Sequence, residues 1–303
     1  MNSTFDSASA ARAATLRPYE AEPIRILAPT QQRAPLVLAS PHSGSFYHPA
    51  FLAASRLDPL ALRRSEDCYV DQIFAGAPAE IGVPLLAALF PRAYLDPNRE
   101  PYELDPGMFR DALPGHVRSR TDRVRAGFGT VARVVSSGTE IYRERLYYAE
   151  AEARIATLYE PYHHALQRLV EATVARFGGA ILIDCHSMPS IGGPSDTDAG
   201  QTRHDIVLGD RHGASCAPRL ADAAEAALAR LGFNVARNDP YAGAHTLKRY
   251  GQPKRHVHAL QIEINRALYV DEATLAKLPG FDELGRKMMR FLHTMAALDP
   301  TAY

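Results

Sequence analysis

Short apolar runs alternate with helical patterns along most of this chain, and this alternation limits the folds that it can adopt. The runs typical of buried strands lie at residues 34–44, 83–90, 180–185, 205–210, 233–244 and 256–269. The helical patterns lie at residues 58–82, 139–176, 217–232 and 280–298. Such alternation is typical of an α/β fold with helices flanking a mostly parallel or mixed sheet. Because no linker or low-complexity stretch interrupts it, we expect one domain over residues 21–303.

Glycine and proline predict where these elements stop. Gly82 is expected to end the first helix and Gly232 the third. Pro161 is expected to kink or split the long second helix, because proline cannot donate the backbone hydrogen bond that a helix needs. Residues 106–138 are rich in glycine, arginine and proline. We expect an irregular excursion there, with the arginines at 110–125 on a solvated surface.

Composition excludes several classes of protein. The 303 residues carry 34 basic and 34 acidic side chains, so the net charge of zero gives no support to a nucleic-acid surface. No apolar run approaches the roughly 20 residues of a membrane span. Residues 1–20 lack the apolar core of a secretory signal and are expected to form a mobile tail. The three scattered cysteines, Cys68, Cys185 and Cys216, fit a reducing cytoplasm better than a disulfide framework.

The segment "ILIDCHSMPS" at 181–190 ends an apolar strand in groups suited to chemistry, Asp184 and His186. Packing in a parallel sheet does not need these groups, and the carboxyl ends of such strands are where ligands bind. Polar residues follow three other predicted strands in the same way: His42, the segment 92–99, and Glu263. We expect all four to meet at one edge of the sheet.

Two imidazoles and a carboxylate are the usual protein ligands of a hydrolytic zinc site, with water in the fourth position. His42 and His186 supply the imidazoles. For the carboxylate, Glu66, Asp67 and Asp71 all fall on the predicted helix at 58–82. Asp67 and Asp71 are four residues apart on one helix face, so their spacing does not choose between them. The alternative interpretation is that these histidines are hydrogen-bonded structural residues and the acids a solvated helix start.

Glu263 stands in the apolar register of "ALQIEI", where an acid is costly to bury unless it is paired or used. It is either the ion-pair partner of Arg266 or a general base for a metal-activated water. Arg92 has two interpretations as well. It stabilises an oxyanion or a second substrate carboxylate, or it pairs with Asp96. Asp184 is expected to accept a hydrogen bond that supports the site.

A resemblance joins these segments. The chain resembles the N-formylglutamate amidohydrolase family, in order and over roughly residues 35–275, through the motifs "SPHSG" (40–44), "SEDCYVDQIF" (65–74), "PRAYLDPNRE" (91–100), "PYHHAL" (161–166), "LIDCHS" (182–187), "LGDRHGASC" (208–216), "NDPYAGA" (238–244) and "LQIEINRALYVDE" (260–272). "PHSG" or "DCHS" alone is a weak signal. Eight motifs in register are strong.

The resemblance implies a fold like that of the zinc carboxypeptidases and aspartoacylases, with His42 and His186 as metal ligands and Glu263 as the base. It also implies that Asn98 and Arg99 hold a substrate carboxylate. Carboxypeptidases take their acid ligand three residues after the first histidine, where this chain has a serine. The family's "TDWHVD" segment instead matches "EDCYVD", which favours Asp67 over Asp71 as the third ligand.

The activity implied by the resemblance is hydrolysis of N-formyl-L-glutamate to formate and L-glutamate, a step of histidine degradation, with one Zn²⁺ per chain in the cytoplasm. The expected partner is a small acidic N-acyl amino acid, and neither nucleic acid nor membrane. Two alternatives remain at this stage. One is a zinc deacylase or carboxypeptidase acting on another N-acyl amino acid. The other is a metal- or amino-acid-binding relative without catalysis, which a retained Glu263 disfavours because binding needs no base.

Four further residues have weaker signals. His163, like its neighbour His164, is predicted to be a capping or surface residue of the long helix. Tyr241 and His245 lie in a glycine-containing loop before the Glu263 strand, where a lid can sit. Asp210 is expected to bond loop amides.

Overall fold

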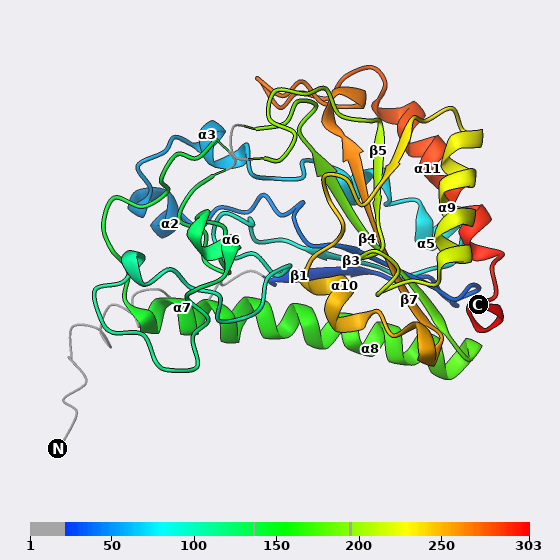
Figure 1. Cartoon of the computed structure of the whole chain (residues 1–303), viewed down its shortest axis with the longest axis horizontal. Coiled ribbons are helices and arrows are strands. Elements are labelled where there is room, and N and C mark those ends of the chain that lie inside the picture. Colours follow the sequence, from blue (N-terminus) through cyan, green and yellow to red (C-terminus); the bar gives the residue numbers. More distant parts are fainter. Residues whose placement is uncertain (1–21, 136, 194–195) are drawn as a thin grey trace.

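A computed structural model describes residues 22–135, 137–193 and 196–303 of the chain. The tail predicted at residues 1–20 lies outside them. The fold is one seven-stranded sheet with helices on both faces, in the strand order β1-β3-β2-β4-β7-β5-β6 (Figure 1). The strands are β1 (Ile24–Leu27), β2 (Leu36–Ser40), β3 (Leu85–Ala88), β4 (Ala180–Met188), β5 (Ile206–Gly209), β6 (Val235–Arg237) and β7 (Val257–Asn265).

The sheet is mixed, as the sequence predicted. Its centre is parallel, because β3, β2, β4 and β7 run in one direction. At the flanks, β1 is antiparallel to β3 and β5 is antiparallel to β7, while β6 runs parallel to β5. These four strands carry the predicted groups: His42 and Arg92 follow β2 and β3, and His186 and Glu263 lie near the ends of β4 and β7. The predicted α/β fold is therefore confirmed, and its geometry brings these strand ends to one edge.

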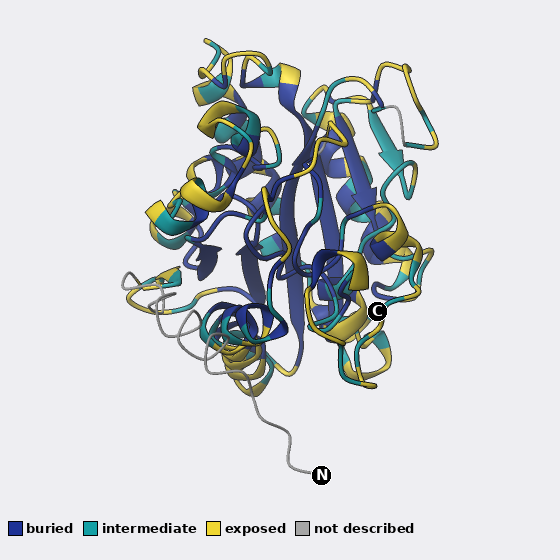
Figure 2. Cartoon of the chain, turned by 90° about the vertical axis from the view of Figure 1, so that its left-hand side faces the viewer, coloured by how far each residue is buried: buried dark blue, intermediate teal, exposed yellow. Residues whose placement is uncertain are grey.

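Two layers of helices bury the two faces of the sheet. The helix α8 (Glu160–Phe177) packs on one face together with α10 (His245–Tyr250). The helices α9 (Pro218–Arg230) and α11 (Phe281–Ala296) cover the other (Figure 1). The central strands are consequently buried on both sides (Figure 2), which explains why they read as continuous apolar runs. Edge strand β1 was not predicted, since two of its four residues are exposed.

The helix predicted at 58–82 is wrong in its extent. The structure has three short helices there, α3 (Pro59–Arg63), α4 (Val70–Ile73) and α5 (Ala77–Glu80). Tyr69 has a φ of 63°, in the left-handed region, and this residue interrupts the helix. Asp67 therefore lies in an irregular segment, and the expectation that it shares a helix face with Asp71 is wrong.

Pro161 disturbs its helix as predicted. The α7 helix (Tyr148–Arg154) passes through a π-helical turn at Ile155–Tyr159 before α8 begins. The proline nitrogen has no hydrogen to donate, and a wider turn accommodates the lost bond. The predicted helix start at residue 139 is wrong, because residues 140, 142 and 146 instead form isolated bridges.

Residues 106–135, 137 and 138 are irregular, as expected, apart from a 3₁₀ turn at Pro106–Met108 and α6 (Asp122–Arg125). The remaining elements are α2 (Pro49–Ala54) and 3₁₀ turns at Pro253–Arg255, Arg266–Leu268 and Pro300–Ala302. Over the described ranges, no helix is long and apolar enough to cross a membrane.

Candidate metal centre and active-site cavity

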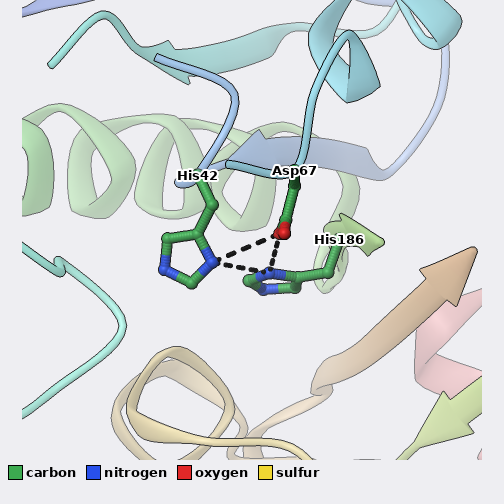
Figure 3. A group of neighbouring side chains, drawn as sticks. All are labelled: His42, Asp67 and His186. Atoms are coloured by element: carbon green, nitrogen blue, oxygen red, sulfur yellow. Dashed lines mark hydrogen bonds and ion pairs between the residues drawn. The ribbon is translucent and has the colours of Figure 1, made fainter. Parts of the chain in front are cut away.

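Three buried side chains converge at the edge where the parallel strands end (Figure 3). His42 follows the last residue of β2 by two positions. His186 lies on β4, two positions before the last residue of that strand, Met188. Asp67 comes from the irregular segment after α3, and its backbone N–H donates to the carbonyl of His42 at 3.0 Å. That bond holds the segment against the His42 turn, so two loops and a strand build one cluster.

The cluster has the dimensions of a metal site. The Nδ1 atoms of His42 and His186 are 3.1 Å apart, and Asp67 Oδ2 lies 3.3 Å and 3.0 Å from them. Around a tetrahedral zinc with bonds of about 2.0–2.1 Å, the ligand atoms lie about 3.3–3.4 Å apart. Two imidazole nitrogens and a carboxylate oxygen that face one another this closely offer a cation three donor atoms. The three residues therefore fit a divalent metal.

Carboxylates behind the cluster orient the two imidazoles. His42 Nε2 lies 2.7 Å from Asp96 Oδ1, and His186 Nε2 lies 2.9 Å from Asp184 Oδ2. Each carboxylate favours the tautomer with its proton on Nε2, which leaves the Nδ1 lone pair for a metal. Asp67 is oriented in the same way, because Arg266 Nη2 donates to its Oδ1 at 3.2 Å and leaves Oδ2 for the cluster.

Charged groups of both signs surround the cluster. Burial lowers the pKa of His186, but Asp184 and Asp67 beside it outweigh burial and hold that pKa well above its ordinary value. Burial raises the pKa of Asp67, yet hydrogen bonds from His186 and His42 bring it well below its usual range. The raised pKa of His186 shows that these carboxylates favour positive charge at the histidines, which a divalent cation supplies, while the lowered pKa of Asp67 reflects the histidines and Arg92 beside it.

Asp71, the other acid considered for the cluster, is elsewhere. Its carboxylate pairs with Arg25 at 2.9 Å, near the edge strand β1. Partial burial raises the pKa of Asp71 despite that partner. The structure thus brings Asp67 to the two histidines and keeps Asp71 away from them.

Glu263 faces the same site from the neighbouring strand. It stands directly opposite His186 in the parallel register of β4 and β7 and lines the cavity. Gln261, two residues earlier and so on the same face of the strand, donates to Glu263 Oε1 at 2.8 Å. Burial raises the pKa of Glu263 to about 7, with the charge of His186 opposing and that of Asp67 adding to the effect. A carboxylate with this pKa is suited to proton transfer at neutral pH.

Arg266, the expected ion-pair alternative for Glu263, bonds to other groups. Its guanidinium donates to Asp67, to Ser187 Oγ at 3.3 Å and to the carbonyl of Arg64 at 3.1 Å. Among the residues that the structure describes, Gln261 is the one hydrogen-bond partner of the Glu263 side chain. The structure therefore leaves one oxygen of Glu263 for the cavity.

The predicted substrate-binding residues line a cavity of about 610 Å³ together with His42, His186 and Glu263. Arg92 pairs with Asp96 at 2.8 Å, which is one of the two expected interpretations. Arg99 donates through Nε to the carbonyl of Phe128 at 3.0 Å and through Nη1 to that of Asn98 at 2.8 Å. Burial lowers the pKa of Arg99 to about 10, so it keeps its charge at neutral pH.

Asn98 lines the cavity and also bonds to groups behind the cavity wall. Its side-chain amide lies 3.3 Å from Asp184 Oδ2, and its Oδ1 accepts the backbone N–H of Thr246 at 2.8 Å. These contacts join the Asn98 loop to β4 and to the start of α10. Asn98 thus ties the cavity wall to the support of His186.

The residues with weaker sequence signals have different outcomes in the structure. His163 is buried and bonds to Tyr250 and to the carbonyl of Pro97, so its prediction as a capping or surface residue is wrong. Its amphipathic helix turns that position toward the core, whereas the next histidine is exposed. Asp210 accepts the N–H of Gly213 at 3.0 Å, as expected. Tyr241 lines the cavity, and His245 bonds instead to Tyr159.

The sequence named Asp96 only as a partner of Arg92 and did not predict its contact with His42, and it did not single out Gln261. Asp96 accepts bonds from His42, Arg92 and the backbone of Asn98. The motif "DPN" was an available signal, because an aspartate that accepts the N–H two residues on forms a common turn. Gln261 was also missed, although the period of two along a strand places it beside Glu263.

Comparisons with known proteins give the site a context. A model of the N-formylglutamate amidohydrolase family matches residues 34–270. An N-formylglutamate deformylase of Pseudomonas aeruginosa is 32% identical over 265 residues, which cover 86% of this chain and 91% of that protein. A Pseudomonas putida protein of the same name is 27% identical over 82% of this chain and 86% of its own.

Two solved structures are similar to the chain. The crystal structure of an N-formylglutamate amidohydrolase from Ralstonia eutropha JMP134 has a TM-score of 0.81 and 38% identity, covering 91% of this chain and 96% of its own. The structure of a gene product of Agrobacterium tumefaciens has a TM-score of 0.64 at 19% identity, with the same coverage, and so shares the fold.

Proposed function

The chain belongs to the N-formylglutamate amidohydrolase family, and from that premise we propose that it hydrolyses N-formyl-L-glutamate to formate and L-glutamate. One observation carries the proposal. The His42–Asp67–His186 cluster, which fits a divalent metal, and Glu263, a buried carboxylate with a raised pKa, face the same cavity. Amide hydrolysis needs both an electrophilic centre and a proton carrier, and this arrangement provides a place for each.

We propose Zn²⁺ as the metal, held by His42, Asp67 and His186. Their two imidazoles and one carboxylate are a donor set typical of catalytic zinc, and the contacts from Asp96, Asp184 and Arg266 pre-orient all three. When bound there, zinc polarises the formyl carbonyl and lowers the pKa of a water molecule from about 15.7 to about 7.

Glu263 is the proposed general base and then the general acid. Its free oxygen takes a proton from the attacking water, since Gln261 holds the other oxygen at 2.8 Å. The same carboxyl returns that proton to the departing amine of glutamate, which must be protonated to leave. A pKa of about 7 in the cation-free site suits both transfers, and a bound cation shifts it toward the ionised form.

The arginines are proposed to act on opposite parts of the substrate. Arg92 lies near the cluster, with Nη1 3.9 Å from Asp67 Oδ1, and its proposed role is to stabilise negative charge that develops on the formyl oxygen. Arg99 has five N–H groups, of which the carbonyl contacts use two. The others are available for a fork contact with a substrate carboxylate, and Asn98 holds the Arg99 segment in place.

The wider setting of the reaction is also a proposal. We infer that residues 21–303 act as one catalytic domain in histidine degradation, in the cytoplasm. The three cysteines are free and buried, which suits a reducing compartment.

A formate-release assay tests the proposal directly. Zinc-loaded protein is given N-formyl-L-glutamate, N-acetyl-L-glutamate and a dipeptide with a C-terminal glutamate, and formate, acetate or free amino acid is measured. We expect the formyl compound to give the highest kcat/KM. A preference for the acetyl compound or the dipeptide would assign the site to deacylation or carboxypeptidase chemistry. No turnover of any of them by metal-loaded protein would point to a binding protein.

A further inference from the structure

The short helix α6 brings an unexpected arginine to the cavity. The sequence predicts that the arginines of residues 110–125 lie on a solvated surface, and Arg120 and Arg125 do. Arg123 is exposed as well, but it also lines the cavity together with Arg99 and Phe128. Figure 1 shows α6 in the teal part of the irregular excursion, to the left of the sheet. The excursion thus contributes one cationic side chain to the wall around the substrate.

Local contacts give α6 a fixed orientation. Thr121 caps the helix by accepting the N–H of Val124 at 3.2 Å, and the Val124 side chain is buried. On the outer side, Arg125 pairs with Asp122. With Val124 turned inward and the Asp122–Arg125 pair turned outward, the side chain of Arg123 is left on the cavity side.

Arg123 is also tied to Arg99 through one residue. The N–H of Phe128 donates to the carbonyl of Arg123 at 2.8 Å, and the carbonyl of Phe128 accepts Arg99 Nε at 3.0 Å. The segment after Phe128 is also held in place, because the N–H of Asp96 donates to the carbonyl of Thr130 at 2.8 Å. The two arginines therefore belong to one connected part of the cavity wall.

The guanidinium of Arg123 differs from the others in its partners. Arg92 pairs with Asp96 and Arg266 with Asp67, while Arg99 bonds to two carbonyls and has Asp96 at 3.8 Å. Among the residues that the structure describes, none accepts a hydrogen bond or forms an ion pair with the side chain of Arg123. After burial, the charges of Arg123 and Arg92 are further causes that lower the pKa of Arg99. The wall around Arg99 thus carries positive charge that no protein carboxylate neutralises at Arg123.

We propose that Arg123 binds the side-chain carboxylate of the substrate and so makes the enzyme selective for a dicarboxylate, while Arg99 binds the α-carboxylate. The inference rests on the proposed function. In N-formylglutamate the α-carboxylate is two bonds nearer to the scissile amide than the side-chain carboxylate. Arg99 is buried and adjoins Asn98, which contacts Asp184 behind His186, whereas Arg123 is an exposed residue of the cavity wall. We therefore match Arg99 with the nearer carboxylate and Arg123 with the farther one. Arg92 bonds to Asp96 at 2.8 Å and lies beside Asp67, at the reacting end of the cavity.

The test compares N-formyl-L-glutamate with N-formyl-L-glutamine, which has the same shape but a neutral side chain. Wild type, Arg123→Ala and Arg125→Ala are assayed with both substrates. We expect Arg123→Ala to lower kcat/KM for N-formylglutamate at least about tenfold and to change that for N-formylglutamine less than about twofold. Arg125→Ala is the matched control, since it removes a cation from the same helix outside the cavity, and it should behave as wild type. Zinc content should be equal in all three.

The results separate this inference from the function on which it rests. If wild type releases formate from N-formylglutamate and Arg123→Ala keeps the same preference over N-formylglutamine, Arg123 does not read the side chain. If Arg125→Ala loses as much preference as Arg123→Ala, the effect is one of general charge and the assignment is wrong. If zinc-loaded wild type does not act on N-formylglutamate, it is the proposed function that fails. Arg123→Lys adds a check, because a point charge should restore part of the preference.

Discussion

The two ends of the cavity are built in different ways. At the metal end, His186 and Glu263 stand opposite each other on adjacent parallel strands, and His42 follows a third. At the recognition end, Arg99 lies on a loop and Arg123 on a four-residue helix within an irregular excursion. At the metal end, the backbone hydrogen bonds of the sheet fix the positions of the side chains. At the recognition end, single hydrogen bonds from a side chain to a backbone carbonyl, such as that of Arg99 to Phe128, fix them.

The chemistry and the substrate specificity of such a site therefore depend on different parts of the fold. The register of β4 and β7 fixes the base relative to the metal cluster, and a one-residue slip would turn the side chains to the other face. The loops have no such constraint, so substitutions there can alter which substrate binds without moving the reacting groups. We therefore expect variants at the metal end to abolish turnover and variants at the recognition end to change substrate preference.

The largest effect is expected from a metal ligand. His186→Ala removes a metal ligand and takes away the imidazole that lies beside Asp67 and Asp184, so activity should fall to background. Elemental analysis should show about one zinc per wild-type chain and little in the variant. Asp71→Asn serves as the control, because that acid pairs with Arg25. Full zinc content in both His42→Ala and His186→Ala would exclude the site. Loss of zinc in Asp71→Asn but not in Asp67→Asn would show that Asp71, and not Asp67, is the metal ligand.

The next largest effect concerns the base. Glu263→Gln keeps the shape of the side chain and should retain zinc, but it removes the proton carrier. We expect kcat to fall by about 10²–10⁴-fold, the usual contribution of general acid–base catalysis. Steady-state kinetics on zinc-loaded protein measure this. A near-normal kcat would return Glu263 to a structural role.

At the recognition end, Arg99→Ala should bind zinc normally and lose at least about tenfold in kcat/KM, since truncating one member of a buried charge pair costs about 2–5 kcal/mol. Arg99→Lys should recover little of this loss, because lysine cannot make a fork contact. Kinetics with N-formylglutamate and N-formylglutamine provide the measurement. If Arg99 holds the α-carboxylate, both substrates lose activity equally. A loss confined to N-formylglutamate would assign Arg99 to the side-chain carboxylate instead.

The smallest effect is expected behind the metal cluster. Asp184→Asn preserves size but removes the charge that orients His186 from 2.9 Å. Replacing such a supporting carboxylate typically costs about 10–100-fold in metal affinity. Competition with a zinc chelator should reveal the weaker affinity, while saturating zinc restores much of the activity. An affinity equal to that of wild type would show that Asp184 does not support the site.

The two ends also differ in how far the sequence predicts them. His42, His186 and Glu263 could be placed because buried strands read as apolar runs and their polar ends stand out. Asp67 could not be placed from spacing, since the left-handed Tyr69 breaks the predicted helix and removes the expected face. The resemblance to a family, rather than periodicity, selected it.

Residues whose role depends on tertiary contacts were harder to predict. Arg123 belongs to an arginine-rich segment that reads as solvated, and only the inward turn of Val124 and the pairing of Arg125 with Asp122 show which arginine faces the cavity. His163 was misjudged for a similar reason, because a histidine on the buried side of a helix gives no sequence signal of its partners at Tyr250 and Pro97.

The central claim, that a metal held by His42, Asp67 and His186 drives hydrolysis of N-formylglutamate, is tested most directly by reconstitution. Protein stripped of metal by a chelator is titrated with Zn²⁺, and formate release from N-formyl-L-glutamate is measured at each step. We expect no activity without metal and a linear rise that ends at about one zinc per chain, with no recovery in His186→Ala. Full activity in protein shown to be free of metal, or equal recovery in the variant, would contradict the account.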